Sequence, residues 1–195
     1  MDRVDTERLI LRPFAEKDFD DLHDIQRRPE VTRYLLWSAR TAQETRESLT
    51  ARVGQSELAA EGDNLNIAVE LRETGRVIGD FNLLWLSEEL MRAEIGFVLN
   101  PDHAGRGYAT EAAREVLRIA FETYGFHRVI GRCDGGNHAS MRLMERSGMR
   151  REALFVEGEM LKGERADLAV YAILGREWRA ARGGREAATP PVPPV

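Results

Sequence analysis

The residues with the clearest chemical potential lie in a glycine-rich turn, Pro101 to Thr110 (PDHAGRGYAT). Gly105 and Gly107 stand one residue apart, just before a segment with helical periodicity. The first N–H groups of a helix have no partner within it and carry partial positive charge, and glycine has no Cβ to hold an anion away. Arg106 adds a cation between the two glycines. The turn therefore suits a pyrophosphate, although a tight turn without a ligand explains the same glycines.

The turn does not match the common nucleotide motifs. It lacks the lysine and the spacing of a P-loop, and it lacks the full dinucleotide fingerprint. A phosphate-bearing ligand of another kind is the remaining functional interpretation, and it needs support from other segments.

Other reactive residue types offer little. Cys133 is a single cysteine, so it forms no intrachain disulfide, and with no base evident beside it we expect a small buried apolar residue rather than a catalytic nucleophile. His103, His127 and His138 lack the paired spacing of a metal site, which favours surface or capping roles. We predict no metal.

The bulk composition fits one globular domain. The chain has 195 residues, 43% hydrophobic and 31% charged, and its apolar runs are too short to cross a bilayer. The first residues contain acidic side chains and no apolar core, so we expect no secretory signal and a cytoplasmic location. The net charge of −5 offers no general attraction to nucleic acid.

The elements that must position the turn can be placed by periodicity. A short strand within 7–14 precedes a helix that begins near Glu16 and ends at Pro29. A second helix is expected over 41–61, ending near Gly62, because Thr41 and Glu44 have the spacing of a capping box.

Three strands, 65–71, 76–85 and 93–99, are separated by turn signals and predict an antiparallel meander. The apolar stripe after the glycine turn predicts a helix over 109–124, and 127–133 reads as a buried strand. A strand, a crossover helix and a second strand imply parallel pairing between 93–99 and 127–133.

The C-terminal part is expected to hold a helix over 138–146 and a hairpin of strands 149–156 and 167–174. Regular structure is predicted to end near Arg182, which gives a domain over 1–182 and a flexible proline-rich tail over 183–195. The hairpin could pair with a second copy, so both a monomer and a homodimer remain open.

An ordered set of motifs resembles the GNAT acetyltransferases. The set is EIGFVL at 94–99, GRGYATEA at 105–112, NHAS at 137–140 and SGM at 147–149. The opening ERLILRP at 7–13 and DLAVY at 167–171 are similar to the RimJ/RimL branch, which acetylates N-termini of ribosomal proteins. The resemblance covers roughly residues 6–180.

The resemblance implies an α/β (α+β) fold with a central mixed, mostly antiparallel sheet, splayed between its fourth and fifth strands and flanked by helices. It implies that acetyl-CoA enters the gap between 93–99 and 127–133. The implied coenzyme-binding residues are Gly96, Phe97 and Val98 for the pantetheine arm, Gly105, Arg106, Gly107, Tyr108, Ala109 and Thr110 for the pyrophosphate, and Asn137 and Ser140 near the sulfur.

Two positions depart from the family pattern. Ala104 stands where many relatives have glutamine or arginine, so one phosphate contact is missing. Met144 stands seven residues after Asn137, where many relatives have a tyrosine thought to protonate the departing thiolate. Thiols have pKa values near roughly 8.5, so Ser140 or water could supply that proton.

Three residues are the catalytic candidates: Glu94, Ser140 and Tyr171. By the resemblance, Glu94 is the first candidate for the base that deprotonates the amine, with an ion pair to a neighbouring arginine as its structural alternative. Tyr171 could face the acceptor, but packing is the better explanation of an aromatic residue in an apolar strand. Trp37 could border the acceptor pocket or close the core.

The resulting prediction is an acetyl-CoA-dependent transfer to a primary amine by direct attack in a ternary complex. A protein or peptide N-terminus is the preferred acceptor. A small-molecule amine such as an antibiotic, a polyamine or an amino acid is the alternative, and so is a non-catalytic sensor of acyl-CoA. No nucleic-acid or membrane partner is expected.

Overall fold

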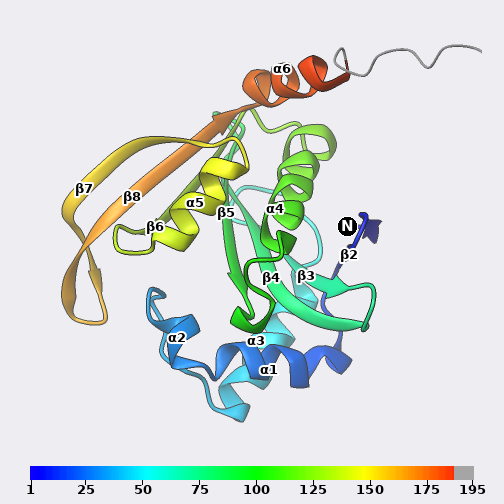
Figure 1. Ribbon diagram of the computed structural model, residues 1–195, viewed down its shortest axis with the longest axis vertical. Coiled ribbons are helices and arrows are strands. Elements are labelled where there is room, and N and C mark those ends of the chain that lie inside the picture. The colour runs from blue at the N-terminus through cyan, green and yellow to red at the C-terminus, as the bar shows by residue number, and fades with distance from the viewer. Residues whose placement is uncertain (187–195) are drawn as a thin grey trace, which may run out of the picture.

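The computed structural model describes residues 1–186 and contains one eight-stranded sheet with helices on both faces (Figure 1). The strand order is β1-β2-β3-β4-β5-β6-β8-β7. The strands are β1 (Val4–Asp5), β2 (Leu9–Arg12), β3 (Asn64–Leu71), β4 (Arg76–Ser87), β5 (Arg92–Leu99), β6 (Arg128–Asp134), β7 (Arg150–Leu161) and β8 (Glu164–Leu174).

The helices form two layers around this sheet. They are α1 (Phe19–Gln26), α2 (Pro29–Thr32), α3 (Ala42–Gly54), α4 (Tyr108–Arg118), α5 (His138–Arg146) and α6 (Gly175–Glu186). Short 3-10 turns occupy Glu16–Asp18 and Pro101–His103, and α4 continues into a π-helical turn over Ile119–Thr123. One face of the sheet packs against α4 and α5 in the main core, and α1 and α3 cover part of the other face.

The sheet topology confirms the predicted meander and crossover. The pairs from β2 to β5 are antiparallel, and β5 pairs with β6 in parallel across α4. β6 then pairs with β8, and β8 with β7, so β7 is the outer edge of the sheet. Counted without the two-residue β1, β5 and β6 are the fourth and fifth strands. The structure thus has the mixed, mostly antiparallel sheet that the resemblance implied.

Helix α4 forms because its apolar residues recur at steps of three and four and find a partner surface. Ala112, Ala113, Val116 and Leu117 are all buried, while the opposite face carries charged side chains. Burying a valine or leucine side chain contributes about 1.5–3 kcal/mol. The π turn ends at Thr123, and Gly125, with a φ of +69°, then reverses the chain toward β6. The strongest amphipathic segment of the sequence thereby anchors the glycine turn at its N-terminal end.

The capping box of Thr41 and Glu44 is present, but the second helix is shorter than predicted. It ends at Gly54 rather than near Gly62. The next residue, Gln55, accepts hydrogen bonds from the backbone and side chain of Asn66, at 2.8 Å and 2.5 Å, and so leaves the helix to brace β3. That long-range contact has no local signature in the sequence.

Other boundaries also shift. Helix α1 ends at Gln26, and Pro29 begins the short helix α2, where proline is well tolerated at the first turn. Helix α6 was not predicted; it runs to Glu186, beyond the expected end of regular structure at Arg182. Residues 187–195 of the predicted tail lie outside the described residues. In the described chain, every helix is too short or too polar to meet the criteria for a bilayer span.

Candidate active site

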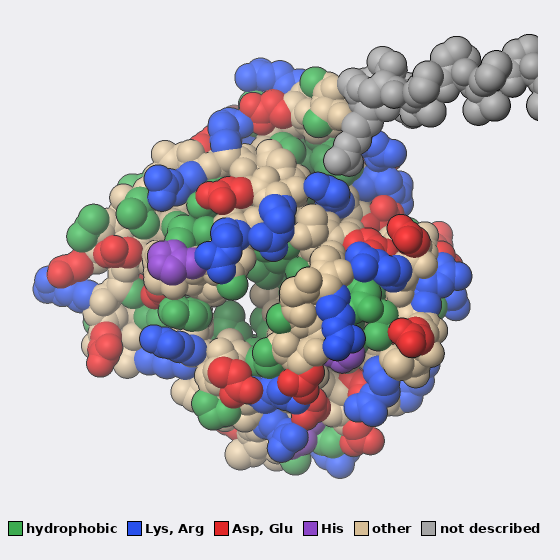
Figure 2. All heavy atoms as spheres, viewed as in Figure 1, with side chains coloured by type: hydrophobic (Ala, Val, Ile, Leu, Met, Phe, Trp, Pro, Cys, Tyr) green, Lys and Arg blue, Asp and Glu red, His purple; other side chains and the backbone are tan. Residues whose placement is uncertain are grey.

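The central feature is a gap between β5 and β6. The two strands pair only at Arg92–Arg128, Ala93–Val129 and Glu94–Ile130. Beyond these pairs, β5 continues to Leu99 alongside β4 alone, and β6 continues to Asp134 alongside β8 alone. The facing edges of residues 95–99 and 131–134 are thus not paired with each other. Figure 2 shows a hollow near the centre of the same view, where the ribbons of β5 and β6 separate in Figure 1.

Glu94 and Arg132 form a bidentate ion pair where the strands part. Arg132 Nη2 lies 2.8 Å from Glu94 Oε2, and Arg132 Nε lies 3.0 Å from Oε1. Alternation along β6 places Ile130, Arg132 and Asp134 on the same face as Glu94. The arginine partner anticipated for Glu94 is therefore present, but it comes from β6 rather than from within β5. The ion pair fixes the carboxylate at the mouth of the gap.

Gly96 lies next in line on that face, opposite Asn82 of β4. A Cβ at Gly96 would come within 2.2 Å of Asn82 Oδ1, so only glycine allows the carboxamide to lie over β5. Asn82 in turn donates to Asn64 of β3 at 3.1 Å. A polar strip therefore reaches the gap from the side covered by α1 and α3.

The glycine turn lies at the N-terminus of α4, as predicted. Gly105 and Gly107 have φ values of +76° and +83°, in the left-handed region that favours glycine. Within the described residues, the N–H groups of 105–107 donate to no backbone acceptor, and Arg106 is exposed. Thr110 accepts a hydrogen bond from Arg146 of α5 at 3.2 Å, which brings a second arginine to the turn. Free amides and two cations fit a diphosphate.

Helix α5 begins directly after the open edge of β6. Asn137 is its N-cap, and its side-chain oxygen accepts the Ser140 N–H at 3.1 Å. Met144 is buried; a Cβ at Gly131 of β6 would meet its sulfur at 2.6 Å, so the thioether packs directly on β6. The Asn137 N–H donates to the Asp134 carbonyl at 2.9 Å, so the start of α5 adjoins the open end of β6, and an apolar side chain fills the position of the family tyrosine.

The environments of Tyr171 and Cys133 favour structural rather than catalytic roles. Tyr171 is 1% exposed, and its hydroxyl donates to Glu145 at 2.9 Å. Burial, followed by that hydrogen bond, raises the pKa of Tyr171 to about 12. Burial also raises the pKa of the Cys133 thiol to about 11, with a smaller effect from Asp134. A thiol that stays protonated at neutral pH is a poor nucleophile, which agrees with its interpretation as an apolar residue, but the side chain is half-buried rather than buried as expected.

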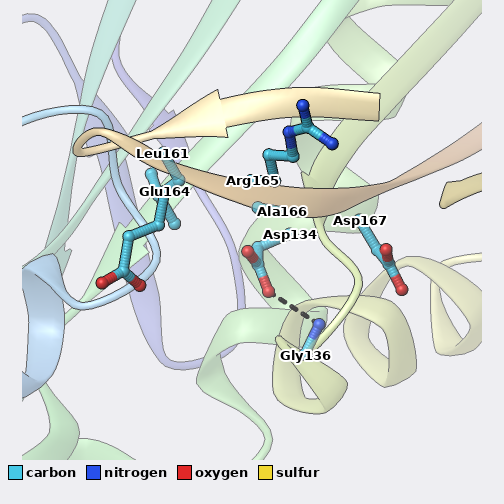
Figure 3. Close-up of a pocket in the computed structure, with 7 residues that line it drawn as sticks. All are labelled: Asp134, Gly136, Leu161, Glu164, Arg165, Ala166 and Asp167. Atoms are coloured by element: carbon cyan, nitrogen blue, oxygen red, sulfur yellow. Dashed lines mark hydrogen bonds between the residues drawn. The ribbon is translucent and has the colours of Figure 1, made fainter. Parts of the chain in front are cut away.

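A pocket of about 340 Å³ lies beyond the open end of β6, between that strand and the β7–β8 hairpin. It is lined by Asp134, Gly136, Leu161, Glu164, Arg165, Ala166 and Asp167. Figure 3 shows the three carboxylates on one side of the hairpin and Arg165 pointing to the other, where Arg165 pairs with Glu157 at 2.8 Å. The pocket therefore has a negative lining.

The hairpin that bounds this pocket is held at its tip and in its middle. At its tip, Lys162 Nζ donates to the Thr32 carbonyl of α2 at 2.8 Å. In its middle, the register of β7 breaks between Phe155 and Glu159, and the Glu157 N–H donates to Asp167 at 2.8 Å. Burial, followed by the nearby Asp134, raises the pKa of Glu159. Negative charge is thus concentrated on this side of the gap.

Sequence reasoning missed three arginines at the site: Arg8, Arg132 and Arg146. Arg132 and Arg146 bind residues 38 and 36 positions away, so their roles have no local signature. Arg8 lies in the ERLILRP segment, which contributed only to the resemblance. Its contact with the carbonyl of Arg106 becomes visible only in the structure.

Comparisons with known proteins agree with this geometry. The family described as Acetyltransferase (GNAT) domain matches residues 8–150. The uncharacterized N-acetyltransferase YnaD of Bacillus subtilis is 31% identical over 177 residues, which cover 90% of this chain and 98% of YnaD. The crystal structure of a GNAT-family acetyltransferase from Bacillus anthracis superposes with a TM-score of 0.81 at 31% identity, covering 90% of this chain and 99% of that one.

The chain therefore belongs to the GNAT acetyltransferases, enzymes that use acetyl-CoA as the acetyl donor. The ribosomal L7/L12 α-N-protein acetyltransferase RimL, solved in complex with coenzyme A, shares the fold, with a TM-score of 0.78 at 18% identity over 89% of this chain and 98% of RimL. Within the described residues, we find no group of three or more His, Cys, Asp or Glu residues arranged to hold a metal ion.

Proposed function

We propose that this chain acetylates a primary amine by direct attack on acetyl-CoA in a ternary complex, with the coenzyme in the gap between β5 and β6. The observation that carries the proposal is the parting of β5 from β6 after Glu94, beside a turn of free amides at the start of α4. The amide-rich pantetheine arm can pair with an open strand edge, and the diphosphate suits the turn.

The residues divide the work as follows. Backbone groups of Gly96, Phe97 and Val98 hold the pantetheine arm, and the amides from Arg106 to Thr110 hold the diphosphate. Asn137 and Ser140, at the start of α5, lie where β6 opens and would face the thioester end of the arm.

The reaction needs a neutral amine. The nitrogen lone pair attacks the thioester carbon, the C–N bond forms, and the C–S bond breaks with departure of the thiolate. In the proposal, Glu94 receives the first ammonium proton directly or through water. The second proton, which the nitrogen loses after the attack, passes to the thiolate through Ser140 or water. Met144 is apolar and cannot provide that proton.

The acceptor enters from the face that carries Glu94, Arg132 and Asp134. A peptide N-terminus is the acceptor suggested by the RimL likeness. The pocket favours a small cationic amine instead, because its carboxylates complement a second positive charge and the docked hairpin tip bounds it. A spermidine N-acetyltransferase from Vibrio cholerae, solved with CoA and spermine, shares the fold, with a TM-score of 0.75 at 20% identity over 89% of this chain and 99% of that chain.

The test is thiol release from acetyl-CoA with a panel of acceptors: spermidine, a diaminoalkane, an aminoglycoside, and peptides with free or blocked N-termini. We expect turnover with at least one primary amine and none with its N-acetylated form. Calorimetry should show CoA binding to the chain without acceptor. A chain that does not bind CoA, or that binds it and acetylates nothing, would contradict the proposal. Cell fractionation tests the expected cytoplasmic location.

A further inference from the structure

We propose that Arg8 is a positioning residue for the coenzyme: it fixes the peptide group between Arg106 and Gly107, so that the Gly107 N–H stays on the ligand side of the glycine turn. This inference rests on the proposed function, in which the turn holds the diphosphate. It assigns a specific task to a side chain that lies about a hundred residues away in the sequence and belongs to the N-terminal segment.

The Arg8 guanidinium contacts the turn on three sides. Its Nη1 donates to the Arg106 carbonyl at 2.9 Å. Its Cζ lies 4.8 Å from the centre of the Tyr108 ring, within the range of a cation–π contact. A Cβ at Gly107 would lie 3.4 Å from Nη2, so the side chain packs along the glycine itself. Three consecutive residues of the turn therefore contact one arginine.

Glu111 anchors this arginine to α4. Arg8 Nε lies 2.7 Å from Glu111 Oε2, and the Arg8 backbone N–H donates to Oε1 at 2.9 Å. The Thr6 hydroxyl donates to the same oxygen at 2.6 Å. Burial opposes the ionised form of Glu111, but the hydrogen bonds from Thr6 and Arg8 outweigh it and lower the pKa of Glu111. The carboxylate is thus a fixed, largely buried partner rather than a mobile surface group.

The geometry of the peptide bond connects these contacts to the ligand. In a trans peptide, the carbonyl and the N–H of the same plane point in opposite directions. When Arg8 holds the Arg106 carbonyl, the Gly107 N–H must point away from Arg8. A rotation of this plane would turn the carbonyl toward the diphosphate, where two negative groups would repel each other.

The turn needs such a restraint because of its glycines. Gly107 adjoins this peptide plane and Gly105 lies one residue before it, and glycine populates positive and negative φ with similar ease. A turn with that freedom would lose conformational entropy on binding, which lowers affinity. Arg8 removes the freedom before the coenzyme arrives.

The experiment compares Arg8→Gln with the wild-type chain on two donors. Calorimetry measures CoA binding, and kcat/KM is measured with acetyl-CoA and with acetyl-pantetheine, which lacks the diphosphate. We expect about tenfold weaker CoA binding and a similar fall in kcat/KM for acetyl-CoA, as for loss of a hydrogen bond to a charged group. The rate with acetyl-pantetheine should stay within twofold of wild type, because that donor does not use the turn.

Arg72→Gln is the matched control. Arg72 also secures the N-terminal segment, through a 2.8 Å hydrogen bond to the Thr6 carbonyl, but no contact joins it to the turn. Its CoA affinity should match wild type. If Arg8→Gln does not fold, Arg8→Lys decides, because lysine keeps the charge but cannot reach Glu111 and the Arg106 carbonyl together. For Arg8→Lys we expect CoA affinity and kcat/KM for acetyl-CoA to fall about threefold, with kcat/KM for acetyl-pantetheine unchanged.

Two results would overturn the inference: equal losses on both donors, or unchanged CoA affinity in the folded Arg8 variants. Failure of the wild-type chain to bind CoA is a different result. It would remove the proposed function, and the role of Arg8 would fall with it.

Discussion

The two sides of the gap between β5 and β6 are built in different ways. On the proposed donor side, one short turn has backbone N–H groups at 105–107 that donate to no backbone acceptor among the described residues, and Arg8 and Glu111 secure that turn. On the acceptor side, side chains from β6 and the hairpin form an acidic pocket. Backbone recognition suits a coenzyme that never changes, whereas side chains can vary with the substrate. The class of reaction can therefore be inferred more readily than the identity of the amine.

Glu94 lies between the two sides, and its replacement should have the largest effect. We expect Glu94→Gln to lower kcat about 100-fold, most steeply at low pH, because the amine then has no carboxylate to take its proton. The measurement is a pH–rate profile of the wild-type chain and of Glu94→Gln. Arg132→Gln is the control, since it breaks the same ion pair but leaves the carboxylate in place. An unchanged profile for Glu94→Gln would assign Glu94 a structural role.

A substitution in the turn should affect the donor side alone. In Gly107→Val, the valine must adopt a φ of +83°, which is costly for a β-branched residue. The backbone N–H groups of the turn should therefore move. We expect about 30-fold weaker CoA binding by calorimetry. Gly62→Val is the control, because Gly62 also has a positive φ, +94°, but lies in open space away from the turn. Equal CoA affinities in both variants would contradict the assignment of the turn.

A charge removed from the pocket should affect the acceptor side alone. We expect Glu164→Gln to raise KM for a diamine about fivefold, less at high salt, with KM for acetyl-CoA unchanged. Glu73→Gln, at the turn between β3 and β4, is the matched control. If the diamine KM does not respond, the pocket does not hold the second charge of the acceptor, and a peptide N-terminus becomes the better candidate.

The smallest effect on activity is expected for Tyr171→Phe, with kcat within about twofold of wild type because the phenol is buried in the core. Stability should respond instead. The ordinary pKa of 10.0 rises to about 12 in the fold, so the stabilisation is complete below pH 10 and is lost as the pH rises toward 12 and beyond. The loss is roughly 2 kcal/mol. Phenylalanine should remove that alkaline fall in urea titrations, and a large loss of kcat would return Tyr171 to the mechanism.

The elements that could be predicted are those with strong local patterns. The stripe of α4, the capping box of Thr41 and the meander all follow from residue spacing, and the crossover fixed the parallel pair. The early end of α3 and the start of α2 at Pro29 depended on contacts that spacing does not encode. Helix α6 follows β8 directly, with the Glu177 carboxylate accepting the Leu174 N–H at 2.8 Å, and it packs through Trp178 against Phe121. Tertiary contacts decide such boundaries.

The candidate site divides in the same way. The glycine turn was predictable because a positive φ favours glycine, whereas Asn137 and Ser140 became candidates only through the resemblance. The partner of Glu94 was expected among neighbouring arginines, but only the sheet register identifies Arg132. The pocket is formed by the end of β6 and the tip of a hairpin some thirty residues later, and no sequence motif predicts that these two segments lie together.

The break in the register of β7 also bears on how the molecule behaves in crowded solution. β7 is the rim of the sheet and exposes Phe155, Val156 and Met160, a combination that normally invites strands of other molecules to add and aggregate. At the break, Glu157 turns to a positive φ and its N–H is already used by Asp167. An incoming strand could not continue its hydrogen-bond ladder past the break, so this irregularity opposes fibrous self-association of the chain.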